Sequence, residues 1–84
     1  MDKAEVIQKI AREVIKNHYY PERGVREDEI NENSNFTTDL GLDSLDFVEL
    51  ACYVQAEYSV VITDEKLARV NTVGELADLV IELA

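Results

Sequence analysis

The stretch DLGLDSLDFVEL, residues 39–50, decides the fold because it contains a turn followed by the start of a helix. Gly41 permits the positive φ of a turn, and Asp43 is a favoured N-cap residue whose carboxylate accepts hydrogen bonds from the first free amides. Asp46 and Glu49 add negative charge near the positive end of the helix macrodipole. The stretch therefore predicts a helix over residues 43–58 that begins directly after a glycine turn.

This predicted helix carries two apolar stripes at helical spacing. The stripe that the core of a small bundle can bury consists of Phe47, Leu50, Ala51, Val54 and Tyr58. The other stripe consists of Leu45, Val48 and Cys52. Acidic side chains flank the second stripe. Because one face of a helix is enough to contact a core, we expect the second stripe to lie outside it.

Other segments also have helical patterns. Residues 3–19 repeat apolar side chains at helical spacing, and Tyr20-Pro21 and Gly24 end that helix. A short helix follows Thr63 and runs to about residue 69. Thr72 with Glu75 three residues later has the form of a capping box, which predicts the last helix.

The connecting segments complete the predicted architecture. Residues 25–38 are expected to form a long loop with a short helical turn near residues 26–30. Residues 59–63 are expected to be an extended connection that places Val60 or Ile62 in the core, since a single strand has no partner here. The predicted fold class is all-α: a small four-helix bundle of three principal helices and one short helix, in a single domain over residues 1–84.

Composition excludes several function classes. The 84 residues include 18 acidic and 8 basic side chains, a net charge of −10, so the chain repels nucleic acid and its partners are expected to be basic. The whole excess of acid lies in residues 24–84, which hold 14 acidic and three basic side chains. The single cysteine indicates a reducing compartment, and no apolar run approaches the ~20 residues that span a bilayer. The N-terminus has neither a signal-peptide nor a transit-peptide pattern. We expect a monomeric cytoplasmic protein that does not insert into membranes.

Catalytic and metal sites are not indicated by the sequence. Residues 41–45 have the outline of a nucleophile elbow, but Leu45 stands where that motif requires glycine. The one histidine, His18, lies at a predicted helix end far along the chain. The aspartates around residues 39–46 lack the spacing of a calcium-binding loop. We therefore expect no catalytic residues and no metal ligands.

Ser44 is the remaining candidate. A hydroxyl in the first turn of a helix projects into solvent beside free backbone amides, where the helix favours an anion. A phosphate ester on Ser44 is compatible with that position. The alternative, that Ser44 only helps to cap the helix, stays open on these grounds.

Residues 40–50 resemble the 4′-phosphopantetheine attachment segment of acyl carrier proteins, in which the serine of an Asp-Ser-Leu sequence bears the prosthetic arm. The similarity covers about residues 30–80, with landmarks at Phe36, Asp39, Glu57-Tyr58, Ile62, Asp64-Glu65 and residues 70–76. The resemblance implies that a phosphopantetheinyl transferase moves the arm from coenzyme A to Ser44, and that the arm holds acyl groups as thioesters. It also implies a carrier rather than an enzyme.

The same resemblance implies roles for the neighbouring residues. Asp43 would help to position the transferase. Contacts with acyl-transfer and synthase enzymes that have basic docking patches would come from Leu45, Asp46, Val48, Glu49 and Cys52. An acyl pocket would be lined by Phe36, Leu50, Val54, Ile62, Leu67, Val70 and Leu76. The alternative for the seven pocket residues is that they only pack in the core. The same alternative stays open for Cys52.

The expected function is thus carriage of acyl thioesters in fatty-acid or related lipid or specialised biosynthesis. Departures from the usual fatty-acid carrier pattern at Phe47, Gln55-Ala56 and Thr63 make a carrier dedicated to one pathway nearly as well supported as the general fatty-acid carrier. An aminoacyl or polyketide carrier is therefore one alternative. The other is an unmodified acidic helical adaptor that docks basic proteins.

Overall fold

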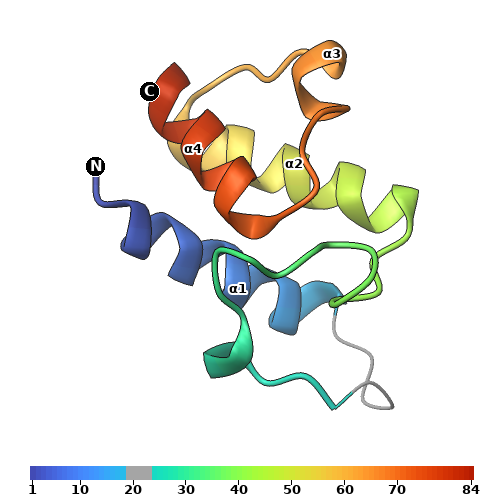
Figure 1. Cartoon of the computed structure of the whole chain (residues 1–84). Helices are drawn as coiled ribbons and strands as arrows, with labels where there is room; N and C mark the ends of the chain where they lie inside the picture. Colours follow the sequence, from blue (N-terminus) through green and yellow to red (C-terminus); the bar gives the residue numbers. More distant parts are fainter. Residues whose placement is uncertain (19–23) are drawn as a thin grey trace.

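The computed structural model describes residues 1–18 and 24–84. Within them, four α-helices and one 3-10 turn follow one another along the chain (Figure 1). Their bounds are α1 Lys3–His18, η2 Glu27–Glu29, α2 Ser44–Tyr58, α3 Asp64–Leu67 and α4 Val73–Leu83. The described residues contain no strand, and their one isolated bridge pairs Asn35 with Thr72. The predicted all-α bundle of three principal helices and one short helix is confirmed.

The core lies between the three long helices. α1 packs against both α2 and α4, and α2 also packs against α4. The largest fully buried side chains are Val6, Ile10, Leu50, Val54, Val73, Leu76 and Val80. Because burying each such side chain contributes ~1.5–3 kcal/mol, this core determines which face of α2 points inward.

Most predicted boundaries are confirmed. η2 lies inside the predicted turn, and Gly24 has the expected positive φ of 66°. The predicted end of α1 at Tyr20-Pro21 lies outside the described residues. After α2, the connection is extended and buries both Val60 and Ile62, whereas the sequence required only one of them. Ser59, with a left-handed φ of 55°, ends α2, and the sequence pattern gave no sign of this cap.

The loop before α2 is hydrogen-bonded to the start of α4, which was not predicted. The amide of Gly74 donates to the carbonyl of Glu32 over 2.9 Å, and the amide of Val73 donates to the carbonyl of Ser34 over 2.9 Å. A Cβ at position 74 would lie 2.7 Å from that Glu32 oxygen, so only glycine permits this approach. The long loop is therefore attached to α4 rather than only connecting α1 to α2.

Three basic residues of α1 pair with acids on other parts of the chain. Lys3 lies 3.1 Å from Asp78 of α4, and Lys9 lies 3.1 Å from Glu57 of α2. Arg12 lies 3.9 Å from Glu27 of η2. The hydrogen bond to Glu57 is the main reason that the pKa of Lys9 is raised. Each exposed ion pair contributes little to the free energy of unfolding. Together the pairs bring the cations of α1 next to acidic side chains of the other elements.

The start of α4 is fixed by a capping box. The carboxylate of Glu75 accepts hydrogen bonds from the amides of Asn71 over 2.8 Å and Thr72 over 2.9 Å, and the hydroxyl of Thr72 accepts from the amide of Glu75. The two backbone hydrogen bonds, that of Asn71 foremost, lower the pKa of Glu75 below its ordinary value of 4.5. The ionised carboxylate is therefore the form that the fold favours.

This predicts how the stability depends on pH. A carboxyl whose pKa is lower in the folded state stabilises the protein above its unfolded pKa, and that contribution is lost as the pH falls through the folded pKa. The variant Glu75→Gln should have a lower free energy of unfolding than wild type at neutral pH, and the difference should narrow in acid. Urea unfolding across a pH series measures it, with Glu82→Gln, an exposed acid of the same helix, as control. A difference that stays constant from neutral to acidic pH would contradict the assignment.

Candidate functional site

Ser44 is exposed and is the first residue of α2. The preceding residue, Asp43, is extended, with φ −87° and ψ −179°, so the helical conformation begins at Ser44. The carboxylate of Asp43 accepts a hydrogen bond from the amide of Asp46 over 2.8 Å, and the carboxylate of Asp46 accepts one from the amide of Asp43 over 3.3 Å. This reciprocal pair is the capping box of α2. The N-cap predicted at Asp43 is confirmed.

The capping box leaves two backbone donors at the start of α2. The amide of Asp46 is bonded to Asp43, and the amide of Phe47 donates to the carbonyl of Asp43 over 3.0 Å. The amides of Ser44 and Leu45 precede these, and helix geometry provides no carbonyl within the helix for them. Together with the macrodipole of a 15-residue helix, they favour negative charge next to the Ser44 hydroxyl. A phosphodiester on this oxygen therefore fits the position.

The segment that leads into Ser44 is anchored to the core. Leu40 and Leu42 are 5% and 4% exposed, and Gly41 between them has a φ of 68°. The amide of Leu42 donates to the carbonyl of Phe36 over 2.8 Å. The ring centroids of Phe36 and Phe47 lie 5.2 Å apart, which joins the loop to the first turns of α2. The segment that precedes Ser44 is thus held in place by apolar contacts and by a backbone hydrogen bond.

One side of α2 remains outside the core. We call it the docking face and define it as Leu45, Val48, Glu49 and Cys52. Leu45 is 65% and Val48 is 50% exposed, and Glu49 and Cys52 are also exposed. The expectation that the second apolar stripe lies outside the core is therefore confirmed. Large apolar side chains that share an exposed face are typical of a surface that binds another protein.

Asp46 differs from the other residues predicted to contact partners. It is half-buried, and its carboxylate is hydrogen-bonded to the amide of Asp43. Asp46 therefore has a structural role at the start of α2, in addition to the charge and the partner contacts predicted for it from the sequence. The spacing Asp43-x-x-Asp46 was the signal for this role, because a capping box needs an acceptor three residues after the N-cap.

The residues predicted to line an acyl pocket belong to the core or its edge. Those within the core are Phe36, Leu50, Val54, Ile62 and Leu76. Leu67 and Val70 are half-buried and pack against it. α3 buries none of its residues, so the core is covered lightly on this side.

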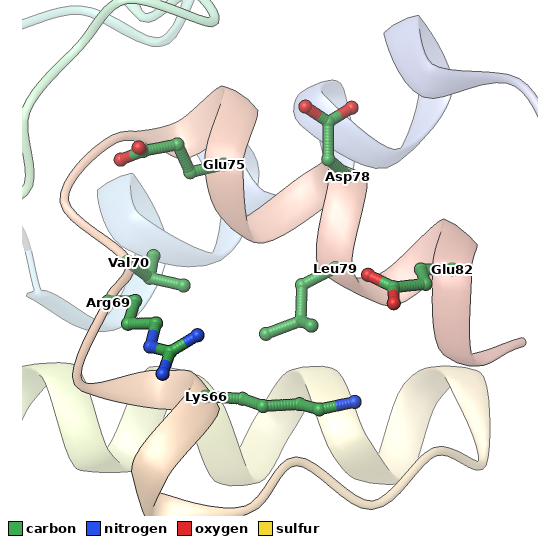
Figure 2. A pocket seen from close by; sticks show the side chains of 7 residues that line it. All are labelled: Lys66, Arg69, Val70, Glu75, Asp78, Leu79 and Glu82. Atoms are coloured by element: carbon green, nitrogen blue, oxygen red, sulfur yellow. The ribbon is translucent and has the colours of Figure 1, made fainter.

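A cleft of about 330 Å³ lies next to Val70, between the end of α3 and α4 (Figure 2). Val70 and Leu79 supply its apolar lining, and charged side chains surround them: Lys66, Arg69, Glu75, Asp78 and Glu82. Figure 2 shows Lys66 and Arg69 projecting from the α3 side toward Leu79. Of the residues that line this cleft, only Val70 was predicted from the sequence as a pocket residue. Leu79 lies three residues after Leu76 on α4, and this helical spacing was the sequence signal that could have predicted the other side of the cleft.

Among residues 1–18 and 24–84, no group of three or more His, Cys, Asp or Glu side chains is placed to hold a metal ion. In the same residues, no helix combines the length and apolar character needed to cross a bilayer.

Comparison with known proteins relates the chain to a family and to solved structures. The family model of the phosphopantetheine attachment site matches residues 22–80. Among solved structures, the chain is similar to the acyl carrier protein from Enterococcus faecalis, a protein of high thermal stability. The two are 28% identical with a TM-score of 0.77, and the match covers 100% of each chain. The range matched by the family includes Ser34, Ser44 and Ser59.

Proposed function

This chain belongs to the phosphopantetheine attachment family, that of the acyl carrier proteins, and from that premise we propose that Ser44 bears its 4′-phosphopantetheine arm. Members of this family are carriers and not enzymes. The arm supplies a terminal thiol that holds an acyl group as a thioester. The part of this chain is to present one hydroxyl, hold the arm and bring its cargo to partner enzymes.

The environment of the three serines in the matched range supports Ser44. Ser34 is only 9% exposed, and its hydroxyl accepts a hydrogen bond from the amide of Asn31 over 3.0 Å. Ser59 is exposed but lies at the C-terminal end of α2, where the macrodipole disfavours an anion. Ser44 is exposed at the opposite, positive end of the same helix. This contrast is the observation that carries the proposal.

Three of the departures from the usual fatty-acid carrier pattern have a local structural role. Phe47 contacts Phe36, and the side-chain oxygen of Gln55 accepts a hydrogen bond from the amide of Ile62 over 2.9 Å. The hydroxyl of Thr63 accepts from the amide of Lys66 over 3.2 Å and caps α3. These departures therefore do not indicate a different cargo, and we take it to be an acyl chain of fatty-acid or related synthesis. We place that chain beside Leu67 and Val70, where α3 covers the core lightly.

The setting in which the carrier works is also part of the proposal. Residues 1–84 act as one monomeric carrier domain in the cytoplasm, where the exposed thiol of Cys52 stays reduced. A tethered acyl group reaches a high effective concentration at each partner that the domain docks against.

Mass spectrometry tests the attachment site. After incubation with coenzyme A and a phosphopantetheinyl transferase, wild type should gain the mass of one phosphopantetheinyl group and Ser44→Ala should gain none. Ser59→Ala, which removes an exposed hydroxyl at the other end of α2, is the matched control and should be modified like wild type. No gain on wild type, or a full gain on Ser44→Ala, would overturn the proposal.

Acyl carrier proteins as a class bind phosphopantetheinyl transferases and synthases, and we assign this contact to the docking face of α2. Leu45 and Val48 provide an apolar centre, and Glu49 provides charge beside it. A small apolar centre with a charged rim is typical of transient protein interfaces. The charge of the docking face fits basic patches on the partners, and it contributes mainly to the rate of encounter and to specificity.

The ionic-strength dependence of the transferase reaction tests this contact. Exposed charges are screened beyond about 8–10 Å at moderate salt, so KM for wild type should rise as salt is added. At low salt, Glu49→Gln should raise KM by up to about fivefold, since an exposed charge pair contributes ~0.2–1 kcal/mol. Glu5→Gln, an equal charge change on α1, should leave KM unchanged. A KM insensitive to salt and to Glu49→Gln would place the binding energy in Leu45 and Val48 instead.

A further inference from the structure

Asn35 organises the turn that precedes the site. Its side-chain oxygen accepts hydrogen bonds from the amides of Thr37 over 2.8 Å and Thr38 over 3.0 Å. Its own amide donates to the carboxylate of Asp39 over 2.7 Å. Its carbonyl accepts from the amides of Asp39 over 3.1 Å and Leu40 over 3.0 Å. Every polar group of the Asn35 backbone and its side-chain oxygen therefore acts within this one turn.

The turn at Asn35 uses the same reciprocal arrangement as the start of α2. In each case a side-chain oxygen accepts from amides two or three residues later, and a following aspartate accepts from the amide of the capping residue. Only residues 40–42 separate the two arrangements. Because Leu40 and Leu42 are buried, these three residues have little freedom to absorb a change in the first turn.

Asn35 also lies at the contact between this loop and α4. It forms the isolated bridge with Thr72, and the amide of the next residue, Phe36, donates to the carbonyl of Asn71 over 2.9 Å. In Figure 1 the green segment before α2 passes close to the start of α4. Asn35 therefore joins the backbone that is held by α4 to the turn that leads into Ser44.

We propose that Asn35 is a positioning residue for modification of Ser44, which it influences through the turn and not by contact. The inference rests on the proposed function, since it concerns the hydroxyl assigned there. The transferase must align this hydroxyl with bound coenzyme A, and small misplacements of a reacting atom lower the rate of a well-oriented reaction steeply. Loss of the Asn35 oxygen releases the amides of Thr37 and Thr38 and allows the start of α2 to move.

The steady-state kinetics of the transferase test this role. Asn35→Ala should lower kcat at saturating carrier protein by roughly tenfold. Asn35→Ser retains an oxygen that can accept from the same amides and should restore most of kcat. Asn33→Ala is the matched control, because Asn33 is exposed in the same loop and its side chain makes no hydrogen bond within the described residues. It should behave like wild type.

The split between kcat and KM separates positioning from simple loss of stability. A partly unfolded carrier lowers the concentration of competent protein, which raises the apparent KM and leaves kcat unchanged. An unchanged kcat for Asn35→Ala, or a kcat that Asn35→Ser fails to restore, overturns the inference. If Asn35→Ala does not fold, Asn35→Gly removes the same oxygen with a residue tolerated at N-caps, and the same outcomes apply. If wild type is not modified at Ser44, the proposed function fails; if only the Asn35 result fails, the proposed function stands.

Discussion

The reciprocal hydrogen bonds between Asp43 and Asp46 fix the residue at which α2 begins, and the candidate site depends on that position. Each residue of an α-helix is rotated by about 100° from the one before it. The buried side chains of Leu50 and Val54 determine which face of α2 points inward, and the capping box determines at which residue the helix begins. With the observed start, one helix buries its inner stripe, exposes the docking face and leaves Ser44 at its positive end.

The bundle supports this helix from two sides. α4 holds the loop before Ser44 through the close approach of Gly74 to Glu32, and Phe36 of the loop contacts Phe47 of α2. α1 supplies cations that pair with acids on other elements, so charge repulsion in a chain of net charge −10 is partly offset within the fold. Glu49, the one acid of the docking face, pairs with no cation of α1 among the described residues and is exposed to solvent.

The sequence predicted most of what is local. A helix cap and an apolar repeat each depend on residues that are close together in the chain. The caps at Asp43 and Thr72 and the apolar spacing therefore predicted where the helices lie and where Ser44 is placed. The resemblance of residues 40–50 to a known attachment segment supplied the family. The contact between Glu32 and Gly74 was not predictable, because it joins backbone atoms far apart in the chain and leaves no periodic signal. The role of Asn35 was missed for a related reason, since an asparagine in a polar loop has many possible partners.

Amide hydrogen exchange at the start of α2 tests the central claim most directly, namely that the Asp43–Asp46 pair fixes the helix start that presents Ser44. In Asp43→Ala, the amide of Asp46 loses its acceptor and should exchange faster than in wild type, while the buried amides of α4 keep their protection. Asp43→Asn retains a side-chain oxygen and should protect the Asp46 amide nearly as well as wild type. Unchanged protection of this amide in Asp43→Ala would contradict the account, because the helix start would then be fixed by other contacts.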